Sequence, residues 1–198
     1  MTTDISYYHE GDNAALMGKL KILGYFKPED RVLDATYGRG TWWKRYRPDF
    51  LIGNDADLKA KVCFHEDFTA FPAAWRDGWD VVCYDPPYKL NGTGGPDDAR
   101  YGCEDTITVP DRLKLVYDGL RGCMKIVKPR GYLLVKCQDQ VAGGRVRWMS
   151  HNLIDIAARH RFFLVERFDM PPARPQPLGR KQKHARRGST LLVFKRER

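Results

Sequence analysis

Short apolar runs alternate along the chain with longer segments in which apolar residues recur every three or four positions. Runs rich in Val, Ile, Leu and Phe are typical of buried β-strands, and the longer spacing is typical of helices. We therefore predict seven strands, at 31–35, 50–55, 61–65, 79–85, 132–137, 161–168 and 189–194. Helices are predicted over 12–24, 109–127 and 146–159.

The helix predicted over 109–127 has signals at both ends. Thr108 and Asp111 have the Thr-x-x-acid spacing of a capping box. Pro129 and Gly131 are expected to stop the helix. Between these signals one apolar stripe is formed by Leu113, Val116, Leu120, Met124 and Val127.

Strands that alternate with helices predict an α/β fold with a mostly parallel sheet. The last two strands have no helix between them, so we predict that the last strand is antiparallel. Residues 171–188, which join these two strands, are rich in Pro, Gly and basic residues and predict an exposed basic loop. Residues 89–108 predict a second, flexible loop. The length of 198 residues suits a single domain over 1–198.

The net charge of +9 is concentrated near the end of the chain. Residues 171–198 hold nine Lys or Arg residues and one acid, which leaves +1 for the first 170 residues. This asymmetry predicts an anionic partner, although a solvated tail would explain it equally well. No apolar run approaches the roughly 20 residues of a membrane span, and the five cysteines include no CxxC pair. We expect no membrane partner, no metal site and a cytoplasmic location, and the oligomeric state stays open.

A glycine-containing motif follows the first predicted strand, as Asp34-Ala35-Thr36-Tyr37-Gly38-Arg39-Gly40. Its two glycines allow a sharp turn and a close approach of the backbone to a ligand. Asp55 ends the second strand and could bind ribose hydroxyls, and Asp67 follows the third strand and could bind an adenine amino group. Ligands of open α/β sheets collect beyond the carboxyl ends of the strands, so these acids predict one nucleoside pocket. Trp43 stands where a dinucleotide site would have a third glycine, which favours a nucleoside without phosphates.

A second motif, Asp85-Pro86-Pro87-Tyr88, follows the fourth predicted strand. An exocyclic amino group of a nucleobase is a poor nucleophile because its lone pair is delocalised into the ring. The Asp85 carboxylate and the Pro86 carbonyl could accept its two N–H groups and turn the lone pair toward an electrophile. Consecutive prolines hold the backbone rigid. The ring of Tyr88 could stack on the base.

With both motifs in place, the chain resembles the S-adenosylmethionine-dependent amino-methyltransferases of the N6-adenine/N4-cytosine DNA methyltransferase group. It is similar to the small single-domain DNA methylases of phages and actinobacteria. The matching segments are 32–40, Asp55, 85–92, 136–140 and 184–194. The resemblance implies a class I Rossmann-like fold with a seven-stranded, mostly parallel sheet, and S-adenosyl-L-methionine as cofactor. The segment after Gly40 departs from the family because it leaves room for only a short or distorted first helix.

The resemblance also implies roles for individual residues. Catalytic residues would be Asp85, Pro86, Pro87 and Tyr88. Cofactor-binding residues would be Asp34, Ala35, Thr36, Tyr37, Gly38, Gly40, Asp55, Asp67 and Asp85. From the charge and position of two loops, the expected nucleic-acid contacts are Lys89, Asn91, Arg180, Lys181, Lys183, His184, Arg186 and Arg187.

Other side chains near the two motifs have open roles. Trp42 and Trp43 are expected to pack the short helix against the sheet rather than to flank the cofactor. Lys136, Gln138 and Asp139 end the fifth strand next to the pocket, either as functional groups or as polar groups that satisfy a strand end.

We expect methylation of adenine N6 in DNA, because an aspartate in the first motif position is commoner among adenine enzymes of this group. The alternatives are an RNA amino-methyltransferase, acting on adenine N6 or guanine N2 of ribosomal or transfer RNA, and an enzyme for cytosine N4 in DNA. A nucleic-acid-binding protein that has lost catalysis is the alternative outside the enzymes. The recognition sequence and any restriction partner cannot be read from the chain.

Overall fold

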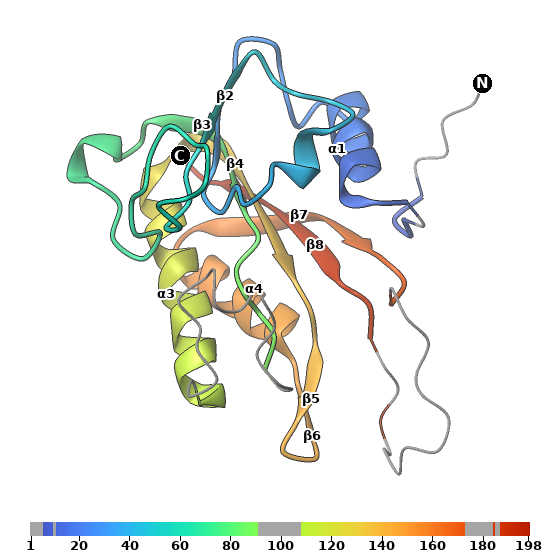
Figure 1. Ribbon diagram of the computed structural model, residues 1–198. Helices are drawn as coiled ribbons and strands as arrows, with labels where there is room; N and C mark the ends of the chain where they lie inside the picture. Colours follow the sequence, from blue (N-terminus) through green and yellow to red (C-terminus); the bar gives the residue numbers. More distant parts are fainter. Residues whose placement is uncertain (1–5, 10, 91–107, 173–183, 185–186) are drawn as a thin grey trace.

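One sheet forms the centre of the described part of the chain (Figure 1). The computed structural model describes residues 6–9, 11–90, 108–172, 184 and 187–198. Six strands pair in the order β2-β1-β3-β4-β8-β7. Their bounds are β1 (Arg31–Asp34), β2 (Phe50–Gly53), β3 (Trp79–Tyr84), β4 (Val127–Cys137), β7 (Phe162–Asp169) and β8 (Thr190–Arg196). The helices are α1 (Asn13–Ile22), α3 (Val109–Ile126) and α4 (Met149–Arg159), with short 3₁₀ helices η1 (Thr41–Trp43) and η2 (Ala73–Trp75).

Strand directions confirm the predicted fold class. β1 pairs in parallel with β2 and β3, and β3 pairs in parallel with β4. β8 is antiparallel to both of its neighbours, β4 and β7. The sheet is therefore mostly parallel with an antiparallel last strand, and the carboxyl ends of β1, β2, β3 and β4 lie at one edge.

Each face of the sheet buries its own apolar core. On one face, Val32, Val81 and Cys83 pack with residues of α1 and η1. On the other, Val82 and Tyr84 pack with α3 and α4. This alternation along β3 follows from the period of two of a strand buried on both sides. Among the described residues we find no helix that is long and apolar enough to cross a membrane.

The prediction of a strand at 61–65 is wrong, and the described sheet has six strands rather than seven. The segment instead folds back on the end of β2. The amides of Cys63 and Phe64 both donate to the carbonyl of Gly53, and Phe64 forms only an isolated bridge with Asn54. The side chains of Cys63 and Phe64 are exposed. An apolar run without a buried face gains too little free energy to form an edge strand.

Two boundaries around β4 also differ from the prediction. Val127 was expected to end the apolar stripe of a helix, but the helix stops at Ile126 and β4 begins at Val127. Pro129 and Gly131 lie within this strand, where the pairing with β3 slips between Val127 and Tyr132. An irregular register tolerates a proline because a regular ladder bond is not required there.

A β-hairpin replaces the first turn of the helix predicted over 146–159. Its strands are β5 (Gln140–Ala142) and β6 (Arg145–Arg147), and α4 starts afterwards at Met149. Gly143 and Gly144 both have positive φ, at 60° and 72°. A two-residue turn of this kind matches the twist of a hairpin. Figure 1 shows the hairpin extending beyond the carboxyl end of β4.

Candidate active site

The loop after β1 turns through two glycines, as the sequence predicts. Gly38 and Gly40 have φ of 54° and 63°. A Cβ on Gly40 would lie 2.7 Å from the hydroxyl of Tyr37, whose ring also lies against Gly53. The Tyr37 hydroxyl accepts a hydrogen bond from Arg47 at 2.9 Å. Gly40 therefore makes room for a packed tyrosine ring as well as allowing the turn.

Asp55 fastens this loop to the end of β2. Its Oδ2 accepts the amide of Gly38 at 2.6 Å, and its Oδ1 accepts the amide of Asp57 at 2.9 Å. The residue is only 3% exposed. Each carboxylate oxygen keeps a further lone pair, so ribose hydroxyls would share these oxygens with the backbone.

Asn54 and Asp67 differ in burial and in what they bind: Asn54 is buried and joins two loops, whereas Asp67 is exposed and bonds within its own turn. Asn54, fully buried, donates to the carbonyls of Ala35 and Glu66 and accepts the Glu66 amide. This link between two loops was not predicted, although a buried asparagine must satisfy its amide. Asp67 is exposed, and its carboxylate accepts the amide and hydroxyl of Thr69.

Two tryptophans of η1 each donate to one acid of the site. Trp43 Nε1 donates to Asp34 Oδ2 at 2.7 Å, and Trp42 Nε1 donates to Asp85 Oδ2 at 3.2 Å. Both indoles are buried against α1 and the sheet, so the predicted packing role is confirmed. The hydrogen bonds were not predicted, although an indole N–H that is buried needs an acceptor.

Thr36 joins the ends of β1 and β3. Its hydroxyl accepts the amide of Asp85 at 2.8 Å, and its own amide donates to Asp34 at 3.2 Å. The structure thus brings Asp34 and Asp85 together at neighbouring strand ends. The pKa of Asp34 is raised to about 7, chiefly by burial and further by the charges of Asp85 and Asp55, while the hydrogen bonds from Trp43 and Thr36 oppose this rise. Burial also raises the pKa of Asp85, against the opposing effects of Lys136 and Trp42.

We expect Asp34→Asn to stabilise the protein above pH 7 and to change its stability little near pH 4.5. The folded pKa of Asp34, about 7, lies above the ordinary aspartate pKa of 3.8. The folded state therefore binds the extra proton, and this group's stabilisation is lost as the pH rises from about 4 to about 7. Asparagine retains an acceptor for Trp43 without a charge. The variant should gain up to about 4 kcal/mol over the wild type across this range.

Urea denaturation of both proteins from pH 4.5 to 8 measures this difference. The exposed Asp155, changed to asparagine, is the matched control and should show a small difference at every pH. An Asp34→Asn advantage that does not grow with pH would contradict the raised pKa.

Three polar contacts hold the segment that contains the second motif. Gln140 donates to the carbonyl of Tyr88 at 2.5 Å and accepts the amide of Leu90 at 3.2 Å. Arg112 donates to the carbonyl of Pro87 at 3.4 Å. Pro86 is buried and Tyr88 is half-buried. The hairpin and α3 therefore position this motif, and the clasp by Gln140 was not predicted.

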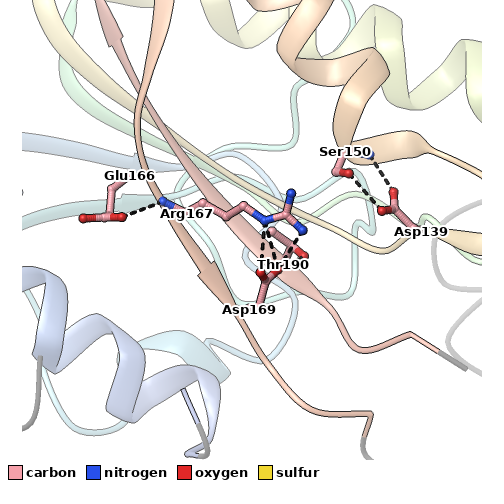
Figure 2. A network of polar contacts seen from close by, with 6 residues as sticks. All are labelled: Asp139, Ser150, Glu166, Arg167, Asp169 and Thr190. Carbon is pink, nitrogen blue, oxygen red and sulfur yellow. Dashed lines mark hydrogen bonds and ion pairs between the residues drawn. The ribbon is translucent and has the colours of Figure 1, made fainter. Parts of the chain in front are cut away.

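The polar residues at the end of β4 and just after it have different roles: some stabilise the fold, and Lys136 faces the candidate site. Asp139 accepts the amide and hydroxyl of Ser150 at 2.8 and 2.9 Å, which caps the start of α4 (Figure 2). A second network in Figure 2 joins Arg167, Asp169 and Thr190 between β7 and β8. Lys136 instead directs its ammonium to Asp85, with Nζ 3.8 Å from Oδ2.

Only some of the expected nucleic-acid contacts lie within the described residues. Lys89 is exposed, and the Arg187 guanidinium lies 4.3 Å from the centre of the Trp148 ring. His184 is half-buried. The positions outside the described residues are Asn91, Arg180, Lys181, Lys183 and Arg186. The exposed Arg145 and Arg147 of the hairpin were missed, although the Gly-Gly pair between two polar-apolar segments was a usable hairpin signal.

No protein-family model and no curated protein matches the sequence. Solved structures match in fold. An N1-methyltransferase for 1,6-didemethyltoxoflavin from Burkholderia thailandensis, crystallised with S-adenosylhomocysteine, is 14% identical with a TM-score of 0.52, covering 94% of this chain and 77% of that chain. The N-methyltransferase NodS from Bradyrhizobium japonicum WM9 is 13% identical with a TM-score of 0.53, covering 94% and 98%. The [4+2]-cyclase SpnF is 12% identical with a TM-score of 0.57, covering 96% and 86%.

These neighbours confirm the fold class, since the chain has the class I methyltransferase fold. The cyclase among them has a name that describes a different reaction, so the fold alone does not fix the chemistry. The reaction has to be argued from the residues of the site.

Proposed function

We propose that the chain transfers a methyl group from S-adenosyl-L-methionine to an exocyclic amino group of a nucleobase, in the first place adenine N6 in DNA. The observation that carries this proposal is the position of Asp85. Asp85 follows the end of β3, beside the glycine loop and Asp34. Two prolines and a tyrosine follow it in the chain. The neighbour crystallised with S-adenosylhomocysteine supports the choice of cofactor.

The residues at the ends of β1 to β3 fit a cationic nucleoside. Three carboxylates, those of Asp34, Asp55 and Asp85, gather there and favour a positive ligand. The helix that follows the glycine loop, η1, is three residues long and offers no extended dipole for a pyrophosphate. When bound, S-adenosylmethionine supplies a methyl group on a sulfonium, whose C–S bond breaks to leave a neutral thioether.

Asp85 and Pro86 would prepare the amino group for attack. The carboxylate accepts one N–H and the Pro86 carbonyl accepts the other, so the lone pair turns out of the ring plane. That lone pair forms the N–C bond, and the nitrogen then loses one proton to water. Trp42 orients the carboxylate by its hydrogen bond at 3.2 Å. The positive charge that develops on nitrogen is stabilised by Asp85.

The surface beyond β4 supports a nucleic-acid substrate. The hairpin exposes Arg145 and Arg147, and Trp148 beside it is 42% exposed with Arg187 over its ring. Arginines contact phosphates, and exposed aromatic rings stack on unpaired bases. Both features lie at the edge of the sheet where Asp85 stands. An amino group inside a duplex cannot reach a methyl donor, so the base must leave the stack.

We expect the double variant Arg145→Ala/Arg147→Ala to weaken DNA binding and to reduce its salt dependence. If both arginines contact phosphates, the log–log slope of affinity against salt should become less negative by about 2. Fluorescence anisotropy with a labelled duplex between 50 and 300 mM salt measures both effects.

The matched control is Lys125→Ala/Arg159→Ala, which removes two exposed charges at the ends of α3 and α4, next to the opposite edge of the sheet. It should leave the slope nearly unchanged. Equal slopes for the wild type and the hairpin variant would contradict a phosphate contact by the hairpin.

Two assays separate the proposed function from its alternatives. Calorimetry with S-adenosylmethionine distinguishes an enzyme from a nucleic-acid binder that has lost catalysis, which should not bind the cofactor. Transfer of tritiated methyl to duplex DNA, single-stranded DNA and total RNA then separates the substrates. Label in DNA supports the proposal. Label confined to RNA favours the RNA enzyme, and the methylated base separates adenine N6 from cytosine N4.

A further inference from the structure

A buried lysine faces the proposed catalytic carboxylate. The side chain of Lys136 is only 10% exposed, and its ammonium lies 3.8 Å from Asp85 Oδ2. Its neighbours in β4, Leu133 to Val135 and Cys137, are fully buried apolar residues. Burial of an ammonium among apolar side chains costs free energy, so a hydrophobic residue here would be expected if packing were the only requirement.

The ammonium has more donors than this one contact uses. It carries three N–H groups, and 3.8 Å is within ion-pair range but longer than a direct hydrogen bond. Among the described residues, the Asp85 carboxylate is the partner that we find for Lys136 Nζ. Lys136 and Asp85 together therefore present a donor beside an acceptor at the carboxyl ends of two adjacent strands, β4 and β3.

That pair is complementary to one edge of a nucleobase. In adenine the 6-amino group stands beside N1, a ring nitrogen that accepts hydrogen bonds. In cytosine the 4-amino group stands beside N3, which also accepts. On the Watson–Crick edge of guanine the 2-amino group stands beside N1–H, a donor that would face the ammonium with the wrong polarity, and the acceptor beside this amino group, N3, lies on the edge next to the sugar.

We propose that Lys136 is a specificity-determining residue, which donates to the ring nitrogen beside the target amino group while Asp85 accepts from that amino group. This inference rests on the proposed function and narrows it. The site then favours adenine or cytosine over guanine when each base presents its Watson–Crick edge. A hydrogen bond from a charged donor contributes about 1.5–3 kcal/mol, which corresponds to a preference of about 10- to 150-fold for a base that has the ring acceptor.

The test compares kcat/KM on oligonucleotides that differ in one atom of the target base. Adenine is compared with 1-deazaadenine, which has C–H in place of N1, and cytosine is compared with 3-deazacytosine. We expect the wild type to prefer the natural base by at least about tenfold.

The variant Lys136→Met should lose this discrimination and methylate the natural and deaza bases within about threefold of each other. The comparison of two proteins and two bases cancels the effect of the ring change on the reactivity of the amino group. Lys136→Arg keeps a charged donor and should keep part of the preference. If Lys136 only supported the position of Asp85, Lys136→Met would lower the rates on the natural and deaza bases by the same factor. Thermal melting and calorimetry with S-adenosylmethionine check that each variant is folded and binds the cofactor.

The outcomes separate this inference from the proposed function. Equal discrimination between natural and deaza bases by the wild type and by a variant without the ammonium would overturn the role of Lys136 while the methyltransferase assignment stands. If Lys136→Met does not fold, Lys136→Arg takes its place in the comparison, and a preference as strong as that of the wild type would overturn the role of Lys136. If the wild type methylates none of the bases, the proposed function fails and takes this inference with it.

Discussion

Asp85→Ala is expected to lower methyl transfer by at least about 100-fold while leaving the affinity for S-adenosylmethionine within a few-fold of the wild type. Removal of a preorganised group that stabilises charge in a transition state costs about 100- to 1,000-fold in rate. The Asp85 carboxylate is the group that would hold the target amino nitrogen. In the variant the backbone amide of residue 85 would still donate to the Thr36 hydroxyl. Single-turnover transfer of labelled methyl, with calorimetry of cofactor binding, measures the two quantities separately.

The control for this variant is Asp155→Ala, which removes an exposed carboxylate from α4. It should keep full activity. Because Asp85→Ala leaves Lys136 without its carboxylate partner, thermal melting must show that the variant is folded at the assay temperature. Retention of even a tenth of the wild-type rate by folded Asp85→Ala would count against the role assigned to Asp85.

Gly122→Ala is expected to destabilise the fold by up to about 2 kcal/mol. Gly122 lies in α3, and a Cβ there would overlap the backbone carbonyl of Phe68. A backbone carbonyl cannot swing aside as a flexible side chain can, so α3 and the segment at Phe68 would have to move apart. Overpacking of this kind typically costs 1–3 kcal/mol, and it opposes the gain of about 1 kcal/mol in helix propensity.

The same substitution at Gly18 gives the opposite expectation. Gly18 lies in α1, and a Cβ there would meet nothing within 4 Å. Gly18→Ala should therefore stabilise the protein by about 0.5–1 kcal/mol through helix propensity alone. Urea denaturation of both variants measures the two shifts. Shifts of the same sign would contradict the close approach of α3 to residue 68.

The sheet could largely be predicted from the sequence because its strands are short apolar runs buried on both faces. Val81 to Tyr84 illustrate this, since all four residues are fully buried and no polar position interrupts them. The run at 61–65 has a similar composition but no core to cover it, and composition alone cannot report whether a partner surface exists. The hairpin β5–β6 was missed because each of its strands is only three residues long, too short to show an alternating pattern.

The sequence predicted where the residues of the candidate site lie along the backbone, but it did not predict the contacts of their side chains. Strand ends and glycines fix where Asp34, Asp55 and Asp85 stand, because parallel strands bring their carboxyl ends to one edge. Which donor reaches which acid depends on side-chain directions across the fold. Trp42 and Trp43 are adjacent in the chain but donate to two different acids, Asp85 and Asp34. The spacing of residues in the sequence does not predict this pairing.

Mass spectrometry of nucleosides tests the central claim most directly. Duplex DNA and total RNA are each incubated with the purified protein and S-adenosylmethionine that carries a deuterated methyl group, and are then digested to nucleosides. We expect deuterated methyl on an exocyclic nitrogen, as N6-methyldeoxyadenosine in the first place, and its loss with Asp85→Ala. Label on a ring carbon or on the sugar, or the absence of label from both DNA and RNA although the cofactor binds, would contradict it.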